Sequence, residues 1–333
     1  VGKCLRLSEK RKSAQYRNFR CGRLGTGDAC RYGLRDLSDH GSFSGITKQR
    51  DKKGYKEEMT AKKKKKKSGG IFWKLLFLIA LAVFCFSMYQ LVTIYLGYKQ
   101  GVDEYHAVAE ATTVQSSEPL EVVEEKKDEE GNLIIPEEEE ITVNPPEVDF
   151  DALKAINDDV VGWLELEAIP SISYPITQGE DNEYYLHRTI KQTYNFAGSI
   201  FIDSTNASDF SDCNTIIYGH NMKNGSMFGK LKQMYESGKY KDSKYLWICT
   251  PDGKYRYEIF SMQYANVNSD VYTLFSEHDD QFGVYVDKMA KQSKVNMKTK
   301  GLSKDDYVVT LSTCTSNESM RFVVQARWVG TYK

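Results

Sequence analysis

Residues 307–314 read Tyr-Val-Val-Thr-Leu-Ser-Thr-Cys, a run in which β-branched and apolar residues dominate. Such a run predicts a β-strand, and this one ends at Cys314. A second strand-like run begins at Arg321, after a polar connection at residues 315–320. If the two strands pair as a hairpin, the residues that flank the loop lie at the same end of the sheet. We therefore expect Cys314 and Arg321 to lie side by side.

A histidine stands in a similar place, because His220 closes another apolar run at residues 214–220. A thiol can attack a carbonyl, an imidazole can transfer protons, and a guanidinium can stabilise an oxyanion. Together the three groups indicate acyl transfer through a thioester. His187 and His278 are the rival histidines, but neither ends a strand-like run.

Each of these residues also has a plainer interpretation. A histidine after a strand is often a hydrogen-bonded structural residue, and Arg321 alone could pair with a surface carboxylate. Arg327 lies on the same predicted strand face as Arg321, but about 20 Å further along at roughly 3.3 Å per residue. Arg321 is therefore the better candidate for a position beside Cys314.

The formal net charge of −1 over 333 residues hides a strong segregation of charge. Residues 1–70 are rich in Lys and Arg, residues 103–151 are rich in Asp and Glu, and the remainder is nearly balanced. No large basic surface is left in the C-terminal region, so we expect no nucleic-acid partner.

Residues 71–98 are almost wholly apolar and long enough to cross a hydrocarbon core of about 30 Å. The alternative is a buried core helix. Six lysines, residues 62–67, stand directly before this run, and acidic residues dominate after it. By the positive-inside rule, we expect a single-pass, uncleaved signal anchor in the cell membrane. The N-terminus would be cytoplasmic and the catalytic domain extracellular, the topology of a type II membrane protein.

The first 58 residues lack apolar periodicity, and Met59 opens a conventional basic region before the apolar run. We hypothesise that translation starts at Met59; a disordered cytoplasmic tail at residues 1–70 is the alternative. Residues 99–148 are acidic and poor in aromatic residues, which predicts a disordered spacer. The acidic run at residues 137–140 could instead be a metal or partner site. A chain truncated to residues 149–333 is expected to retain activity.

Residues 149–333 have the composition of a globular domain with one core. A short helix is expected at residues 150–163, and helical insertions near 227–237 and 276–292. Short strands are expected at residues 171–176, 198–203, 214–220, 245–250, 255–267, 307–314 and 321–329. This pattern predicts an α+β domain, mainly β, built on a barrel or a sandwich. Cys213 and Cys249 read as core residues, and without a C-x-x-C pair we expect no metal and no cofactor.

Seven short motifs follow one another in this domain. They are NDDVVGW (157–163), YPITQG (174–179), DNEYYL (181–186), GSIFID (198–203), YGHNM (218–222), MF (227–228) and TLSTC (310–314), with Arg321 after the last. In this order and spacing they resemble the class B sortases, cysteine transpeptidases of the Gram-positive cell surface. The resemblance covers residues 150–329.

The resemblance implies an eight-stranded β-barrel with flanking helices, one of which lies in the insertion at residues 275–292. It implies that His220, Cys314 and Arg321 form the active site. By the same match, residues that line the groove for the sorting peptide would be Asn182, Leu186, Tyr218 and Ser312, with Thr313 shaping the site beside the thiol.

The implied reaction is transpeptidation at a C-terminal sorting signal of an exported protein. Cys314 would attack the carbonyl of a Thr, His220 would protonate the leaving amine, and a peptidoglycan precursor of the lipid II type would supply the acceptor amino group. Two alternatives stay open on the sequence: a membrane-tethered cysteine endopeptidase with water as acceptor, and a non-catalytic surface binding domain. A thiol ordinarily has a pKa of about 8.5 and an imidazole about 6.5. Either the pair is shifted or a minor thiolate–imidazolium fraction reacts, and the resemblance favours the second account.

Overall fold

The computed structural model describes residues 69–127, 131, 133 and 143–333. The chain divides into two units, whose described parts are residues 69–90 and, with the gaps just given, residues 91–333. The predictions about the lysine run, the start at Met59 and the acidic run at residues 137–140 lie outside the described residues.

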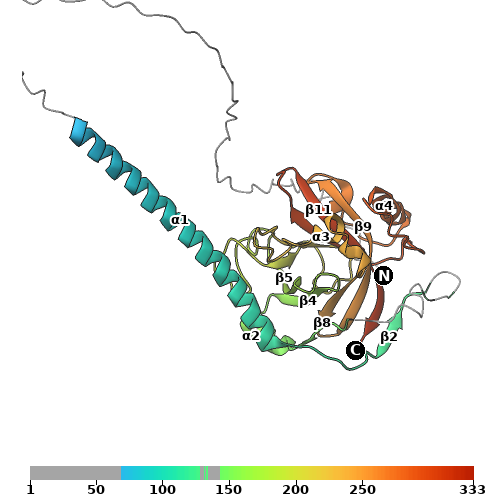
Figure 1. Cartoon of the computed structure of the whole chain (residues 1–333). Coiled ribbons are helices and arrows are strands. Elements are labelled where there is room, and N and C mark those ends of the chain that lie inside the picture. The colour runs from blue at the N-terminus through green and yellow to red at the C-terminus, as the bar shows by residue number, and fades with distance from the viewer. Residues whose placement is uncertain (1–68, 128–130, 132, 134–142) are drawn as a thin grey trace, which may run out of the picture. The chain divides into compact units, whose positions relative to one another are not determined.

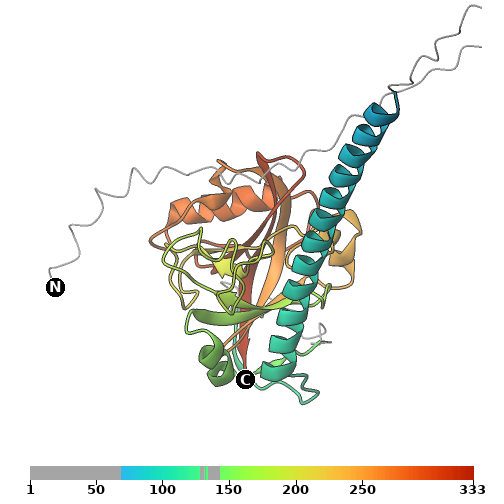
Figure 2. The ribbon, with the colours of Figure 1, turned by 90° about the vertical axis from the view of Figure 1, so that its left-hand side faces the viewer.

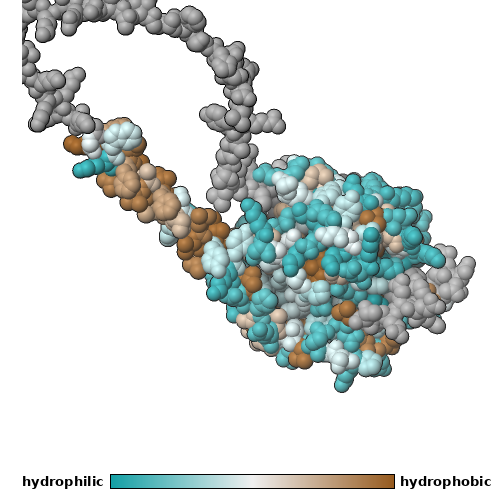
Figure 3. Space-filling model, in the orientation of Figure 1, coloured by the Kyte–Doolittle hydropathy of each residue, from teal (hydrophilic) through white to brown (hydrophobic). Residues whose placement is uncertain are grey.

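Helix α1 (Gly69–Thr112) begins in the first unit. There most of its side chains are apolar and exposed, as Phe77 and Phe84 illustrate, and Figure 3 shows much brown, hydrophobic surface along this helix. Within the described part of the chain, α1 is the one helix long and apolar enough to cross a membrane. The sequence prediction of an apolar span is thus met by a helix of sufficient length.

The second unit is built on a closed β-barrel. Its eight strands, in sheet order, are β10 (Val308–Cys314), β7 (Asn214–Tyr218), β6 (Ile200–Ile202), β5 (Ser173–Thr177), β4 (Val160–Leu166), β8 (Tyr245–Thr250), β9 (Gly253–Asn266) and β11 (Met320–Tyr332). Strand β11 also pairs with β10, which closes the barrel (Figure 1). The pairs β10–β7 and β5–β6 are parallel and the others are antiparallel. The eight-stranded barrel expected from the sequence is confirmed.

Shorter elements surround the barrel. Strand β2 (Val122–Glu125) pairs with the end of β11, and β1 (Thr113–Val114) pairs with β3 (Glu147–Val148). The helices of the second unit are α2 (Phe150–Ile156), α3 (Gln233–Glu236), η1 (Lys239–Lys241), η2 (Asp270–Tyr272) and α4 (Asp280–Gln292). Helix α4 is the flanking helix expected in the insertion at residues 275–292.

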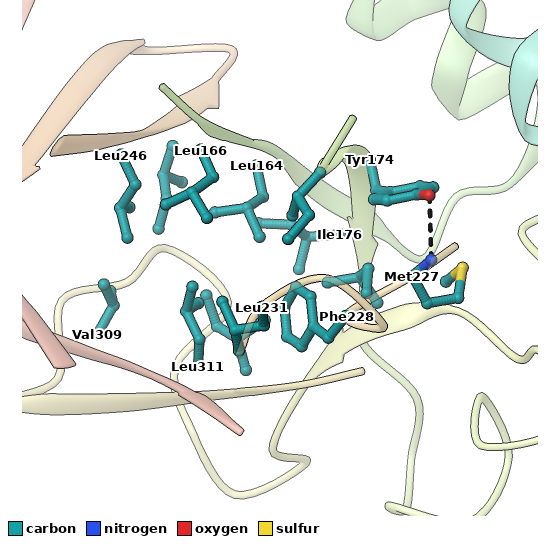
Figure 4. Close-up of a cluster of buried hydrophobic side chains, with 14 of the residues drawn as sticks. Leu164, Leu166, Tyr174, Ile176, Met227, Phe228, Leu231, Leu246, Val309 and Leu311 are labelled. Atoms are coloured by element: carbon teal, nitrogen blue, oxygen red, sulfur yellow. Dashed lines mark hydrogen bonds between the residues drawn. The ribbon is translucent and has the colours of Figure 1, made fainter. Parts of the chain in front are cut away.

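Strand alternation divides the buried side chains into two clusters. On β10, Val309 and Leu311 belong to the barrel interior, where they meet apolar residues of β4, β5 and β8 (Figure 4). Val308 points to the outer face and belongs to a second cluster with Phe282 and Met289 of α4. Helix α4 lies against the outer face beside β9 in Figures 1 and 2. One face of β10 therefore fills the barrel, and the other is covered by α4.

The helix predicted at residues 150–163 is too long. Helix α2 begins after Asp149, whose side chain accepts a hydrogen bond from the backbone N–H of Ala152, and it ends at Ile156. Asn157 then adopts an extended backbone, and residues from Val160 onward form β4. β-Branched residues at 160 and 161 followed by Trp163 favour a strand, so Val160 is buried as a strand residue rather than as part of a helical stripe.

The disordered spacer predicted at residues 99–148 is wrong for the described residues of that range. Helix α1 continues to Thr112, and its residues Tyr105 and Val108 are buried in the barrel-side core cluster. Further on, Lys126 forms an ion pair with the buried carboxylate of Asp306. The acidic composition describes the exposed positions, while apolar residues at helical spacing face the domain. Among the described residues, the unit that contains the barrel therefore includes residues 91–127 as well as those after 149.

Candidate active site

The strand register brings the three predicted catalytic residues into one row. In the parallel pair β7–β10, residue 308 lies opposite 214 and residue 312 opposite 218, so the same offset places His220 opposite Cys314. In the antiparallel pair β10–β11, Cys314 lies directly opposite Arg321. Neighbouring strands are about 4.8 Å apart, so the three positions are adjacent at one end of the barrel. This juxtaposition agrees with the hairpin expected from the sequence.

Backbone and side-chain hydrogen bonds fix the loop after β7 to the end of β10. The N–H of Gly219 donates to the carbonyl of Ser312 at 3.1 Å. The side-chain Nδ2 of Asn221 donates to the carbonyl of Cys314 at 2.8 Å. His220 lies between these two anchors, so its backbone position relative to Cys314 is determined on both sides.

The His220 side chain is half-buried, and its Nε2 lies 2.7 Å from the carbonyl oxygen of Leu186. A carbonyl only accepts hydrogen bonds, so Nε2 carries a proton and the lone pair of the neutral ring is on Nδ1. Burial lowers the pKa of His220, and the nearby His187 and Arg321 lower it further, whereas the Leu186 hydrogen bond acts in the opposite direction. In the neutral imidazole, Nδ1 is therefore the atom that can accept a proton.

Arg321 is held by the loop that connects β10 and β11. Its side chain is buried, and Nη1 donates to the carbonyls of Glu318 and Met320 at 2.8 and 3.0 Å. Among the residues that the structure describes, none supplies a carboxylate that pairs with Arg321. The plainer interpretation, a surface ion pair, is thus not what the described residues form. Within the described part of the chain, no carboxylate therefore compensates the charge of this guanidinium, which belongs to the residue opposite Cys314 in the strand register.

Arg327, the rival arginine, is held in the protein interior by hydrogen bonds to other residues. It is fully buried, and its Nη2 donates to the carboxylate of Glu258 at 2.8 Å and to the carbonyl of Lys300 at 2.6 Å. It pairs in register with Val308, six residues from the Cys314 end of β10. The structure therefore agrees with the preference for Arg321.

Two of the predicted groove residues meet at a buried carboxylate that sequence reasoning missed. Asp203 accepts hydrogen bonds from Asn182 Nδ2 at 2.9 Å and from the hydroxyl of Tyr218 at 3.0 Å. Thr205 donates to the same carboxylate through its hydroxyl at 2.6 Å. The signal available in the sequence was the position of Asp203 at the end of a predicted strand, directly before a polar loop.

The other predicted groove residues are placed differently from one another. Leu186 contributes its carbonyl to His220, and the Ser312 hydroxyl lies 2.8 Å from the hydroxyl of Tyr272. Thr313 alternates onto the inner face of β10 with Leu311, and its hydroxyl is buried without a hydrogen-bond partner among the described residues. The structure therefore does not bring the Thr313 side chain to the face that carries Cys314.

Tyr272 is a second residue that the sequence analysis missed. It lies in η2, is 6% exposed, and interacts electrostatically with both Cys314 and Arg321. Burial raises the pKa of Tyr272 to about 12, so its phenol is protonated at neutral pH. No local pattern marks this residue, because its partner Ser312 lies 40 positions away in the chain. Within the described residues, no group of three or more His, Cys, Asp or Glu could hold a metal ion.

Comparisons with known proteins give the site its context. The Sortase domain model matches residues 164–329. Sortase B of Listeria monocytogenes is 38% identical over 187 residues, which cover 53% of this chain and 72% of the relative. The chain belongs to the sortase family.

Solved structures place this sortase in class B. The sortase B of Bacillus anthracis shares 29% identity with a TM-score of 0.54, and the match covers 71% of this chain and 99% of that chain. A Staphylococcus aureus sortase B–substrate complex shares 30% identity with a TM-score of 0.51, covering 55% and 85%. The sortase is accordingly a cysteine transpeptidase, and the non-catalytic interpretation is set aside.

Proposed function

We propose that the protein cleaves a C-terminal sorting signal after Thr and transfers the cleaved protein to an amino group of the cell wall. Cys314 is the nucleophile, His220 transfers the protons, and Arg321 stabilises the oxyanion. The observation that carries this proposal is the strand register that aligns these three positions. The solved complex of the Staphylococcus aureus relative with its substrate supports a peptide ligand of this kind.

In the first half-reaction, the Cys314 thiol gives its proton to Nδ1 of His220 as the sulfur attacks the Thr carbonyl carbon. The carbonyl oxygen becomes an oxyanion, and the fixed guanidinium of Arg321 donates hydrogen bonds to it. The imidazolium then protonates the amide nitrogen, the C–N bond breaks, and the C-terminal peptide leaves as an amine. The product is a thioester between Thr and Cys314.

In the second half-reaction, an amine attacks the thioester carbonyl and transfers a proton to the now neutral His220. The tetrahedral intermediate expels the sulfur, which recovers its proton from the imidazolium. The new bond is an amide between Thr and the acceptor. We infer that the acceptor is the amino group of a peptidoglycan precursor of the lipid II type.

We infer a type II topology for the anchor. Residues 71–98 cross the membrane, the basic residues before them stay in the cytoplasm, and the catalytic domain lies outside the cell. This arrangement agrees with the apolar helix α1. It places the catalytic domain on the side of the membrane where exported substrate proteins are found.

The experiment that tests the substrate uses a panel of quenched fluorescent peptides with the sequences Asn-Pro-Gln-Thr-Asn, Leu-Pro-x-Thr-Gly and Ser/Pro-Pro-x-Thr-Gly. The unaltered protein is expected to cleave one class between Thr and the next residue. Variants Cys314→Ala, His220→Ala and Arg321→Ala are expected to lose activity by at least about 100-fold. Cleavage of the same peptide by Cys314→Ala at an undiminished rate would refute the proposed nucleophile.

A second experiment separates transfer from hydrolysis. Cleavage is repeated with hydroxylamine or an oligoglycine amine present, and the products are identified by mass spectrometry. A transpeptidase gives a hydroxamate or an amide adduct on Thr. If free acid remains the main product at saturating amine, the protein is an endopeptidase with water as acceptor.

A further inference from the structure

The last part of α1 contacts the loop that orients the active-site histidine. Gly97 and Gly101 lie one helical turn apart, and a Cβ added at Gly97 would be 2.5 Å from the ring of Phe196. The side-chain Nδ2 of Asn195 donates to the carbonyl of Gly97 at 3.1 Å. The ring of Tyr98 meets that of Phe196 at 4.7 Å between centroids. The two glycines therefore let the helix backbone approach the loop at residues 185–199 closely.

Tyr105, two turns after Gly97, makes a second polar contact in this interface. It is 5% exposed, and its hydroxyl donates to the carbonyl of Gly198 at 2.9 Å and lies 2.9 Å from Oγ of Ser199. Burial raises the pKa of Tyr105, so the phenol keeps the proton that it donates. The hydroxyl of Ser199 in turn donates to the carbonyl of Arg188 at 2.8 Å. Through Ser199, the Tyr105 hydroxyl thus connects the end of the loop, at Gly198, to its beginning, at Arg188.

Gly198 lies directly against the carbonyl of Leu186, which is hydrogen-bonded to His220. Its φ of +59° is a left-handed conformation that favours glycine. A Cβ at this position would lie 2.4 Å from the carbonyl oxygen of Leu186 and 2.7 Å from that of Tyr185. The carbonyl of Leu186 is the group that accepts the hydrogen bond from Nε2 of His220. The position of Gly198 therefore sets the position of the histidine's partner.

A second chain of contacts runs from the same tyrosine to the histidine backbone. The rings of Tyr105 and Tyr174 meet edge to face at 5.5 Å. The hydroxyl of Tyr174 accepts a hydrogen bond from the N–H of Met227 at 3.0 Å, which Figure 4 shows as a dashed line. The N–H of Phe228 donates to the carbonyl of His220 at 3.0 Å. Both the side chain and the backbone of His220 are thus connected to α1.

We propose that Tyr105 is a positioning residue for His220, and that α1 acts on the active site through the hydroxyl of this residue. The inference rests on the proposed role of His220 in proton transfer. Tyr105 touches neither the thiol nor the substrate groove residues; it acts through Gly198 and the Leu186 carbonyl. A residue in the membrane-side helix thereby controls the orientation of a proton-transfer group.

The test compares two phenol-to-phenyl changes on the same helix in the full chain. Tyr105→Phe keeps the ring that packs on Tyr174 but removes the hydroxyl that donates to Gly198 and contacts Oγ of Ser199. Tyr98→Phe is the matched control, because the hydroxyl of Tyr98 makes no hydrogen bond within the described residues. We expect kcat for peptide cleavage to fall by about tenfold in Tyr105→Phe with KM within twofold, since small misplacements of a reacting group are costly. Tyr98→Phe is expected to leave both constants within twofold.

The pH profile of kcat/KM separates positioning from a general loss of folded protein. The groups that act on the charge of His220 are His187, whose ring stacks on it at 5.7 Å, Arg321, and the carbonyl of Leu186. Only the carbonyl favours the charged imidazole. Displacing it lowers the pKa of His220, so the limb that reports this histidine is expected to move to lower pH in Tyr105→Phe. A smaller amount of folded enzyme would reduce the amplitude and leave the limb in place.

A pair of glycine variants provides an independent check. Gly198→Ala adds a Cβ against the Leu186 carbonyl, whereas Gly238→Ala has the same left-handed backbone, with φ +67°, and no neighbour within 3.8 Å. Only Gly198→Ala is expected to reproduce the loss in kcat and the acidic shift. The proposal is overturned if Tyr105→Phe and Gly198→Ala behave like their controls while His220→Ala is inactive. Should His220→Ala remain active, the proposed function itself fails.

Discussion

At the scale of single residues, the proposed catalytic side chains are oriented largely by backbone carbonyls. The carbonyl of Leu186 holds Nε2 of His220, and those of Glu318 and Met320 hold the Arg321 guanidinium. Carbonyls accept hydrogen bonds from a positive group without neutralising it. Among the described residues, Arg321 therefore has carbonyl rather than carboxylate partners, and in the neutral ring of His220 the lone pair is on Nδ1.

The geometry of Arg321 leads to a prediction about Arg321→Lys. A lysine keeps the positive charge but lacks the planar fork that can bind two carbonyls and an oxyanion at once. We expect kcat/KM for peptide cleavage to fall by about 10–100-fold, as for removal of one oxyanion donor. Arg188→Lys, a nearby arginine whose guanidinium lies over the Tyr184 ring, is the control and is expected to change activity by less than threefold. Equal activity of Arg321→Lys and the unaltered protein would contradict the role of the fork.

The stacked pair His187 and His220 leads to a prediction about pH. A charged His187 disfavours a second charge on His220, and the pKa of His220 is already lowered by burial. Replacing His187 with Asn removes this repulsion, so the pKa of His220 rises and the corresponding limb of kcat/KM moves to higher pH. His106→Asn, on the exposed side of α1, is expected to leave the profile unchanged. A shift to lower pH in His187→Asn would contradict the electrostatic account.

At the scale of elements, the strands were the most predictable part of the fold. Apolar and β-branched runs placed β8 and β10 within one residue of their observed limits, because these two strands are short and mostly buried. The prediction that the two strands pair as a hairpin also placed Cys314 beside Arg321, and the register agrees with it. The predicted boundary between α2 and β4 was wrong, because Val160 fits the apolar stripe of a helix and a strand equally well.

The central strand β10 allows a prediction about stability. Leu311 is fully buried in the barrel interior, so Leu311→Ala leaves a cavity and is expected to cost about 2–5 kcal/mol. For a domain of this size that corresponds to a Tm lower by roughly 4–20 °C. The matched control is Val284→Ala on α4, where the side chain is 70% exposed, and its Tm is expected to stay within about 2 °C. Similar Tm values for the two variants would contradict the assignment of the core.

Contacts between distant elements account for what the sequence could not predict. Tyr272 meets Ser312 across 40 positions, and Tyr105 meets Gly198 across 93. The contact between Tyr105 and Gly198 was the harder one to predict, because Tyr105 lies next to an acidic region whose composition resembles that of a linker. A backbone carbonyl such as that of Leu186 leaves no trace in the residue types at all.

At the scale of the whole molecule, a buried carboxyl makes stability depend on pH. Glu165 is 6% exposed, and burial raises its pKa to about 7, against an opposing hydrogen bond from Ser173. The folded protein binds a proton there more tightly than the unfolded chain, so stability falls as pH rises from about 4.5 to 7. Glu165→Gln keeps the shape without the charge and is expected to be more stable at pH 8 by on the order of 2 kcal/mol.

The measurement for this prediction is the Tm of both proteins between pH 5 and pH 8. The difference between Glu165→Gln and the unaltered protein should grow with pH and level off above pH 7. Glu183→Gln, an exposed glutamate, serves as control and should show no such trend. A Glu165→Gln protein that is less stable than the unaltered one at pH 8 would contradict a protonated Glu165 in the fold.

The measurement that bears most directly on the central claim is the mass of the intact protein after mixing with a cleavable sorting peptide. A thioester at Cys314 adds the mass of the N-terminal peptide fragment through Thr, and proteolysis should locate that mass on the peptide that contains Cys314. Hydroxylamine should remove the adduct and release a hydroxamate, while Cys314→Ala should gain no mass. Peptide cleavage that proceeds without any adduct, or with an adduct on another residue, would contradict the account.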